Sequence, residues 1–268
     1  MITFALAMLA VASLSSAEAR TESAPYLIPP AERGLPLIRN FLPRQYRGHE
    51  QVWAITETRD GLMLFANLNR ISEYDGLNWR NIDVPGGSFI RAMIRDDAGT
   101  VWIGGVNEVG RLVPGADGKL VYESLRHLVP EAGDLGAFWC AHLRPDGVWL
   151  QSANALLRWN GKSFDYWKVE SKGAALSYEF RDQLIVCGDQ GWFTPLPGGK
   201  WRQVGGAELA PWLPRFSLPG PGGKWLVGTG AKGIMDFAAD ATYQPFPTEA
   251  DEWLKKARPF SGRRLADG

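Results

Sequence analysis

The stretch YRGHEQVWAITETRDGLMLFANLNRISEYDGLNWRNI, residues 46–82, contains four short segments rich in β-branched and aromatic residues. Turn residues separate these segments: Asp60 and Gly61 follow the first, and Asp75 and Gly76 divide the last two. An Asp-Gly pair between two such segments is typical of a tight β-hairpin. The stretch therefore predicts two consecutive hairpins, which together make one antiparallel sheet of four strands.

The first hairpin recurs along the chain. Its copies read TRDGLMLFAN (58–67), DDAGTVWIGG (96–105), RPDGVWLQS (144–152), FRDQLIVCG (180–188) and PGGKWLVGT (221–229). A second hairpin follows each copy, most clearly LLRWNGKSFDYW at residues 156–167. The turns of the first hairpins, and one at the end of the chain, fall at Gly61, Gly99, Gly147, Gln183, Gly223 and Gly268. A repeat of roughly 40 residues indicates a modular fold in which copies stack on one another.

Four strands in each repeat predict an all-β fold, a β-propeller of four-stranded blades. We expect five blades, at about 51–84, 88–123, 137–168, 174–205 and 214–247, and the start of a sixth at 258–268. Residues 35–46, LPLIRNFLPRQY, are expected to form a lone outer strand. This domain would then span 35–268 as a partial propeller whose ring is incomplete. The alternative is a closed ring of five blades with 257–268 as a tail.

The first residues predict export. Residues 4–14, FALAMLAVASL, form an apolar run of 11 residues, and Ala17-Glu18-Ala19 supplies a small-x-small cleavage motif. This pattern is typical of a signal peptide, here residues 1–19, followed by a linker over 20–34. The segment before the apolar run contains no Lys or Arg, which departs from the usual pattern. We expect a periplasmic or extracellular location, and no later stretch is apolar for long enough to span a membrane.

Charge and composition narrow the partners. The chain has 29 basic and 29 acidic residues, so it has no net positive charge to attract nucleic acid. We therefore expect no nucleic-acid partner.

The sequence predicts no metal and no cofactor. Two cysteines and three scattered histidines offer too few ligands for a metal site. The motif GTGAKG at 228–233 has the glycine spacing of a dinucleotide-binding loop, but IMDF follows it where that loop needs a helix. Cys140 and Cys187 are either two small buried side chains or a disulfide, and the sequence leaves both open.

The longer, variable loops of the predicted blades are the candidate ligand-binding face. In a propeller these loops join the second strand to the third, and the fourth strand to the next blade. Polar and aromatic residues there suit a small polar ligand, such as a sugar or an amino-acid derivative. The candidates are His49, Asn67, Asn69, Arg70, Arg91, Asn107, Glu108, Trp139, Gln151 and Asp189.

Each candidate also has a plainer interpretation. Loops are polar in most proteins, and a histidine such as His49 caps a loop more often than it binds a ligand. Trp102, Trp149 and Trp225 recur at one position of the second strand, which predicts packing between blades. No pattern of a catalytic triad, zinc site or carboxylate pair stands out, so no catalytic residue is assigned.

Residues 46–82 resemble the first blade of the two-component regulator propellers, the periplasmic sensor regions of bacterial hybrid histidine kinases. VWIGGVNEVGRL (101–112) and DGVWLQSANALLRWNGKSF (146–164) are similar to its later blades. The resemblance implies an amino-terminal fragment of a longer protein, with more blades, an immunoglobulin-like domain, a transmembrane helix and a cytoplasmic kinase beyond it. Inner-membrane anchoring, kinase activity and any dimer would depend on those further domains.

Two functions follow from these observations. The first is a non-catalytic, extracytoplasmic ligand-sensing domain in two-component signal transduction. The second is a secreted propeller enzyme that acts on glycans as a lyase or hydrolase, with Glu108 and either His49 or Arg91 as its working groups.

Overall fold

The structure is a computed structural model that describes residues 38–68, 70–86, 89–130, 133–173, 175–212, 214–230, 232–238, 242–257 and 261–262. The chain divides into two compact units, Met1–Asn40 and Phe41–Gly268. Only residues 38–40 of the first unit are described, and they form no helix or strand. The predicted signal peptide (1–19), the linker (20–34) and most of the predicted start of a sixth blade (258–268) lie outside the described residues.

Five four-stranded antiparallel sheets make up the second unit, and strands pair in chain order within each sheet. Blade 1 contains β1 (Ala54–Glu57), β2 (Met63–Ala66), β3 (Arg70–Tyr74) and β4 (Trp79–Asp83). Blade 2 contains β5 (Ala92–Arg95), β6 (Val101–Gly104), β7 (Val109–Pro114) and β8 (Leu120–Ser124). Blade 3 contains β9 (Phe138–Arg144), β10 (Gly147–Ser152), β11 (Ala155–Trp159) and β12 (Phe164–Lys168).

Blade 4 contains β13 (Leu176–Phe180), β14 (Gln183–Gly188), β15 (Gly191–Leu196) and β16 (Lys200–Gly205). Blade 5 contains β17 (Pro214–Pro219), β18 (Trp225–Thr229), β19 (Gly233–Phe237) and β20 (Tyr243–Pro245). The prediction of an all-β propeller built from four-stranded blades is confirmed.

Two of the turns that predicted the hairpins are stabilised by the same pair of side-chain to backbone hydrogen bonds. The side-chain oxygen Oδ1 of Asp75 accepts hydrogen bonds from the backbone N–H groups two and three residues further on, at 2.8 and 2.6 Å. Asn160 does the same in blade 3, at 3.1 and 3.0 Å. The next residues, Gly76 and Gly161, have φ angles of 96° and 98°, which glycine adopts without strain. The short polar side chain and the glycine together fix these two hairpins.

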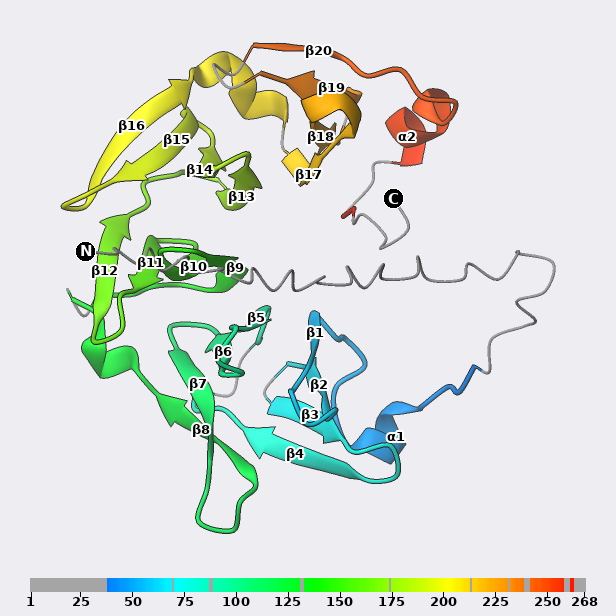
Figure 1. Cartoon of the computed structure of the whole chain (residues 1–268), viewed down its shortest axis with the longest axis vertical. Coiled ribbons are helices and arrows are strands. Elements are labelled where there is room, and N and C mark those ends of the chain that lie inside the picture. Colours follow the sequence, from blue (N-terminus) through cyan, green and yellow to red (C-terminus); the bar gives the residue numbers. More distant parts are fainter. Residues whose placement is uncertain are drawn as a thin grey trace, which may run out of the picture. The chain divides into compact units, whose positions relative to one another are not determined.

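The blades contact one another through their first strands. Figure 1 shows β1, β5, β9, β13 and β17 toward the centre of this unit, with β4, β8, β12, β16 and β20 on the outside. Contacts join β1 to β5, β5 to β9, β9 to β13 and β13 to β17. Each blade therefore begins at the centre and ends at the periphery.

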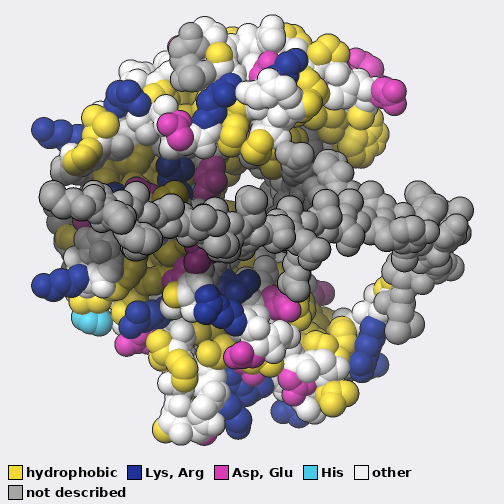
Figure 2. All heavy atoms as spheres, in the orientation of Figure 1, with side chains coloured by type: hydrophobic (Ala, Val, Ile, Leu, Met, Phe, Trp, Pro, Cys, Tyr) yellow, Lys and Arg dark blue, Asp and Glu magenta, His cyan; other side chains and the backbone are white. Residues whose placement is uncertain are grey.

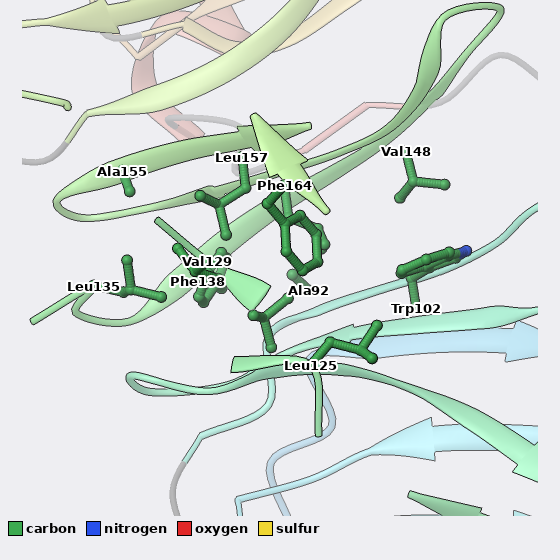
Figure 3. Packing of buried hydrophobic residues seen from close by; sticks show 12 residues of the cluster. Ala92, Trp102, Leu125, Val129, Leu135, Phe138, Val148, Ala155, Leu157 and Phe164 are labelled. Carbon is green, nitrogen blue, oxygen red and sulfur yellow. The ribbon is translucent and has the colours of Figure 1, made fainter. Parts of the chain in front are cut away.

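A hydrophobic cluster fills the space between each pair of consecutive blades. One cluster lies between blades 2 and 3. Three similar clusters lie between blades 1 and 2, between blades 3 and 4, and between blades 4 and 5. Figure 3 shows side chains of blade 2 facing those of blade 3, among them Ala92, Trp102, Leu125, Val148, Leu157 and Phe164. The core is thus divided into layers between sheets.

Neighbouring residues on one strand serve different layers. On β6, Ile103 packs toward blade 1, whereas Trp102 packs toward blade 3. On β10, Leu150 packs toward blade 2, whereas Trp149 packs toward blade 4. Successive side chains of a strand point to opposite faces, so a blade covered on both sides needs apolar residues at every position. This explains the continuous apolar runs in the repeats.

The recurring tryptophans pack between blades, as predicted. Trp102 and Trp149 are buried, and Trp225 packs against the cluster between blades 4 and 5. Their indole N–H groups donate to Asp96, Asp146 and Ser217. The polar end of each ring is therefore satisfied while its body fills the layer.

Arginine side chains link the first turns of adjacent blades. Arg144 of blade 3 donates to the carbonyl of Asp182 in blade 4, at 2.5 Å, and Arg181 of blade 4 donates to the carbonyl of Gly223 in blade 5, at 3.2 Å. Arg59 of blade 1 donates in the same way to the carbonyl of Asp97 in blade 2. These bonds add directional contacts to the non-directional packing of the layers.

The segment before blade 1 differs from the prediction. A lone outer strand was expected over 35–46, but the described part contains a short helix, α1 (Pro43–Tyr46). Pro43 suits the first helical position, and the Gln45 side chain accepts a hydrogen bond from the N–H of Leu42. Phe41 and Tyr46 pack against Trp79 of β4, so this segment covers the outer strand without pairing with it.

The other described helices lie between or after blades, except for the last 3-10 helix, which forms the first turn of blade 5. They are the 3-10 helices η2 (Arg126–Leu128), η3 (Ala207–Trp212) and η4 (Pro221–Gly223), and the α-helix α2 (Asp251–Ala257). At the start of α2, which follows blade 5, the N–H and hydroxyl of Thr248 both donate to Asp251. None of the helices in the described segments is long and apolar enough to cross a membrane.

Both cysteines are free, so the structure contains the buried-thiol alternative and not the disulfide. Cys187 is buried and Cys140 is partly buried. On the face seen in Figure 2, Lys and Arg side chains are spread among Asp and Glu side chains and do not form a single basic field. This distribution agrees with the balanced charge of the sequence.

The layered core makes a stability prediction. Leu157 is fully buried between blades 2 and 3, so Leu157→Ala is expected to lower the free energy of unfolding by about 2–5 kcal/mol. The same substitution at Leu77, which is 82% exposed at a hairpin tip, should change it by less than about 0.5 kcal/mol. Urea unfolding of both variants measures the difference, and equal effects would contradict the layered core.

Candidate ligand-binding site

The loops singled out in the sequence meet at one edge of the blades. The N–H of Ile90, just before β5, donates to the carbonyl of Asn67, just after β2, at 3.1 Å. The N–H of Phe138, at the start of β9, likewise donates to the carbonyl of Gly105 after β6, at 2.9 Å. The turn after the second strand of one blade therefore holds the entry to the next blade. The first residues of β5 and β9 lie at this edge.

Four residues at this edge form a cluster around one cation. The Cζ atom of Arg91 lies over three aromatic rings, 4.1 Å from the centroid of Trp139, 4.3 Å from that of Phe89 and 4.6 Å from that of Trp53. Trp53 precedes β1, Phe89 and Arg91 precede β5, and Trp139 is the second residue of β9. We call these four residues the Arg91 cluster. Three blades contribute to it.

Local packing directs Arg91 into this cluster. Its neighbours in sequence are both buried, Ile90 in the layer between blades 1 and 2 and Ala92 in the layer between blades 2 and 3, whereas Arg91 itself is only partly buried. Gly104 brings β9 close to blade 2, since a Cβ atom at Gly104 would lie only 2.6 Å from Cβ of Phe138. This close approach places Trp139 beside Arg91.

The cation in the cluster has an unusual environment. The Nε atom of Arg91 is buried, and it has no hydrogen-bond partner among the residues that the structure describes. Burial lowers the pKa of the Arg91 guanidinium. Within the described segments, no Asp or Glu forms an ion pair with Arg91. A partly dehydrated cation without a counter-charge is costly, because hydrogen bonds or an ion pair normally compensate burial.

The rings of the cluster remain accessible to solvent. Trp53 is 36% exposed and Trp139 is 41% exposed, whereas Trp102, Trp149, Trp167 and Trp192 are buried in the layers. An accessible aromatic surface beside a cation with free N–H groups can bind a polar ligand from solution.

Of the ten predicted site residues, the structure brings Arg91 and Trp139 into direct contact. The sequence analysis missed Trp53 and Phe89. A signal was available, because Trp53 precedes Ala54 of β1 just as Arg91 precedes Ala92 of β5. Comparing the residues immediately before the first strand of each blade, instead of the loop residues, would have placed Trp53 and Arg91 together.

Asn67 and Gln151 hold the backbone at this edge. Both side chains are fully buried. Nδ2 of Asn67 donates to Ser72 Oγ at 2.8 Å, and Nε2 of Gln151 donates to the carbonyl of Ala175 at 2.9 Å. Gln151 therefore links blade 3 to the entry of blade 4. Each side chain keeps one buried oxygen without a hydrogen-bond partner.

Asn107 and Glu108 are occupied by neighbouring groups. Oδ1 of Asn107 accepts from the N–H of Leu135 at 3.0 Å, which fixes the loop before β9. Oε1 of Glu108 accepts from the hydroxyls of Tyr122 and Ser124, at 2.9 and 2.6 Å. Burial and the Glu108 carboxylate together raise the pKa of Tyr122 well above its ordinary value, so Tyr122 remains a donor.

Two other predicted residues, His49 and Arg70, lie around blade 1. Nδ1 of His49 accepts from the N–H of Gln51 at 3.1 Å, which is the loop-capping arrangement. Arg70 forms an ion pair with Asp83 on the adjacent strand, at 3.7 Å. Asn69 lies outside the described residues.

Asp189 lines a separate cavity between blades 3 and 4, with a volume of about 400 Å³. Its carboxylate accepts from the Ser171 hydroxyl at 2.7 Å and from the N–H of Lys172 at 3.2 Å. These hydrogen bonds, chiefly the one from Ser171, lower the pKa of Asp189. Val169 and Val186 are among the apolar residues of the cavity, and no residue of the Arg91 cluster lines it. Asp189 therefore does not belong to the Arg91 cluster.

A serine, a histidine and a carboxylate meet between β9 and β13. Nε2 of His142 lies 2.9 Å from Oγ of Ser177, and Nδ1 of His142 lies 3.9 Å from Oε1 of Glu179. Ser177 is only 1% exposed, and the distance to Glu179 is too long for a hydrogen bond. Burial, together with the charge of Arg144, lowers the pKa of His142 to about 4. The group is therefore a buried contact between blades and cannot reach a substrate.

No three His, Cys, Asp or Glu side chains of the described segments come together as a metal site.

Comparison with known proteins supports the fold. No family model matches the sequence, and no curated protein is similar to it. The crystal structure of virginiamycin B lyase from Staphylococcus aureus is similar with a TM-score of 0.54 and 17% identity, over 74% of this chain and 70% of that chain. At that identity the likeness shows a shared fold alone.

A second solved structure belongs to a protein assigned to a hybrid two-component system, BT3049 from B. thetaiotaomicron. Its extracellular domain is similar with a TM-score of 0.42 and 13% identity, over 80% of this chain and 36% of that chain. At a TM-score below 0.5 this likeness supports no conclusion about the function of the chain. The comparisons therefore support a propeller-like fold. Any inference about activity has to rest on the residues of this chain.

The buried histidine makes a pH prediction. The unfolded chain takes up a proton on His142 below about pH 6.5, whereas the folded protein resists it until about pH 4. The free energy of unfolding should therefore fall by about 2 kcal/mol from this residue between pH 7 and pH 5. In His142→Gln, urea unfolding should show a shallower loss over that range, while the exposed His127→Gln variant should behave like the parent. Identical pH dependence in all three proteins would contradict the assignment.

Proposed function

We propose that this propeller is an exported, non-catalytic ligand-binding domain of the sensor type, and that its ligand binds at the Arg91 cluster. The observation that carries the proposal is the Arg91 guanidinium, which lies among three aromatic rings and whose buried Nε finds no hydrogen-bond partner in the described part of the chain. A bound ligand could supply the missing acceptor. Export rests on the predicted signal peptide at residues 1–19.

The described residues favour binding over catalysis. The glycan-cleaving alternative needs Glu108 with His49 or Arg91 as acid and base. The carboxylate of Glu108 instead accepts two hydroxyl hydrogen bonds, and Nδ1 of His49 accepts a backbone N–H. The rings around Arg91 are from Trp and Phe, which cannot transfer a proton in catalysis. The cluster as described can bind and orient a molecule.

The origin of the cluster suits sensing. Trp53, Arg91 and Trp139 come from three consecutive blades, whose first strands pack side by side. A ligand that contacts all three favours the arrangement of blades in which they are close, and so shifts the population of that state. In a two-component sensor, this shift would be passed to domains that follow the propeller.

The test is a thermal-shift panel of sugars and amino-acid derivatives with the full chain. Compounds that stabilise the protein are expected to bind Arg91→Met at least about tenfold more weakly, because the acceptor group of the ligand loses the guanidinium N–H donors. The exposed Arg202→Met variant on β16 is the matched control and should bind like the parent. The proposal fails if every hit binds Arg91→Met and the parent equally, or if the parent converts a hit into product.

A further inference from the structure

The Arg91 cluster also indicates the chemical class of its ligand, and this step rests on the proposed function. We infer that the ligand presents a carboxylate to the Arg91 guanidinium and lays its body against the rings of Trp53 and Trp139. The inference combines three observations: which donors are free, how much charge the cluster contains, and where its apolar surface is accessible.

The free donors require an acceptor. A guanidinium carries five N–H groups in one plane, and the aromatic rings attract its charge without offering an in-plane lone pair. For Arg91, no hydrogen-bond acceptor is found among the described residues for its buried Nε. A carboxylate has two oxygens at the spacing of two parallel guanidinium N–H groups, so it can accept from both at once. A hydroxyl group offers one acceptor atom instead of two spaced oxygens, and it adds no charge.

The charge of the cluster fits a single carboxylate. Its four residues contain one cation and no anion. A carboxylate would therefore neutralise Arg91 without displacing an existing partner. A phosphate carries close to two negative charges. The single cation of the cluster would leave about one of those charges uncompensated.

The exposed rings require a body beside the carboxylate. Trp53 and Trp139 are 36% and 41% exposed, although Arg91 lies over both. A bare anion would leave that aromatic surface in contact with water. A sugar ring or an aromatic side chain next to the carboxylate would cover it, since both present C–H or ring faces that pack on indole. The structure therefore points to a sugar acid or an acidic amino-acid derivative, which share the carboxylate and differ in the body.

Matched pairs of compounds test this inference by calorimetry. One arm compares glucuronate with glucose and galacturonate with galactose. The other compares N-acetylphenylalanine with its amide and phenylacetate with phenylacetamide. In at least one arm, the acid is expected to bind the parent at least about tenfold more tightly than its neutral partner. The arm that shows this preference identifies the body of the ligand.

Two arginine variants and one tryptophan variant complete the experiment. The preference for the acid should disappear in Arg91→Met and fall strongly in Arg91→Lys, which keeps the charge but loses the paired donors. Trp139→Leu should weaken both members of a binding pair, because it removes a ring and leaves the cation. Arg91→Lys keeps the inference testable if Arg91→Met does not fold.

The outcomes separate the inference from the proposed function. If neutral partners bind as tightly as the acids and depend on Trp139, the cluster binds ligands but the carboxylate inference is wrong. The same holds if Arg91→Met retains the preference for acids. If no compound binds up to about 10 mM, or binding is indifferent to both residues, the carboxylate inference and the proposed site fail together.

Discussion

The constraint on which this structure depends is that a blade apolar on both faces cannot exist alone. Each middle blade presents alternate side chains of the same strands to two neighbours, as Ile103 and Trp102 do on β6. A sheet with two apolar faces is stable only when a neighbouring sheet packs against each face. Stacking of blades follows from this requirement, and the first strands are brought together at the centre of the unit (Figure 1). The Arg91 cluster is a consequence, since its residues are neighbours only because their blades are.

Much of this fold could be predicted from the sequence, because its signals are local and repeated. The Asp75-Gly76 and Asn160-Gly161 turns depend on hydrogen bonds within a few residues, and the recurring tryptophans mark one position in three of the five copies. The segment at 35–46 was predicted wrongly where it is described. Its apolar pattern suits an outer strand, but Pro43 and the Gln45 cap favour a helical turn that packs on Trp79. Aromatic packing does not distinguish the two conformations in a sequence.

The candidate site was predictable only in part, for a physical reason. Arg91 and Trp139 could be assigned to the correct edge because propeller topology determines which loops share a face. Their contact with Trp53 and Phe89 depends on how closely blades approach, and that depends on details such as Gly104 opposite Phe138. Asn67 and Gln151 have the residue type of a ligand contact but serve as buried links between loops. Polarity in a loop does not distinguish these two uses.

The central claim is that residues from separate blades form one interacting cluster around Arg91. A double-mutant cycle with Arg91→Met, Trp139→Leu and the double variant tests it most directly, by urea unfolding of the full chain. The account predicts a coupling free energy of about 0.5–2 kcal/mol between the two positions, because the guanidinium lies 4.1 Å from the ring centroid. Strictly additive effects of the two substitutions would contradict it.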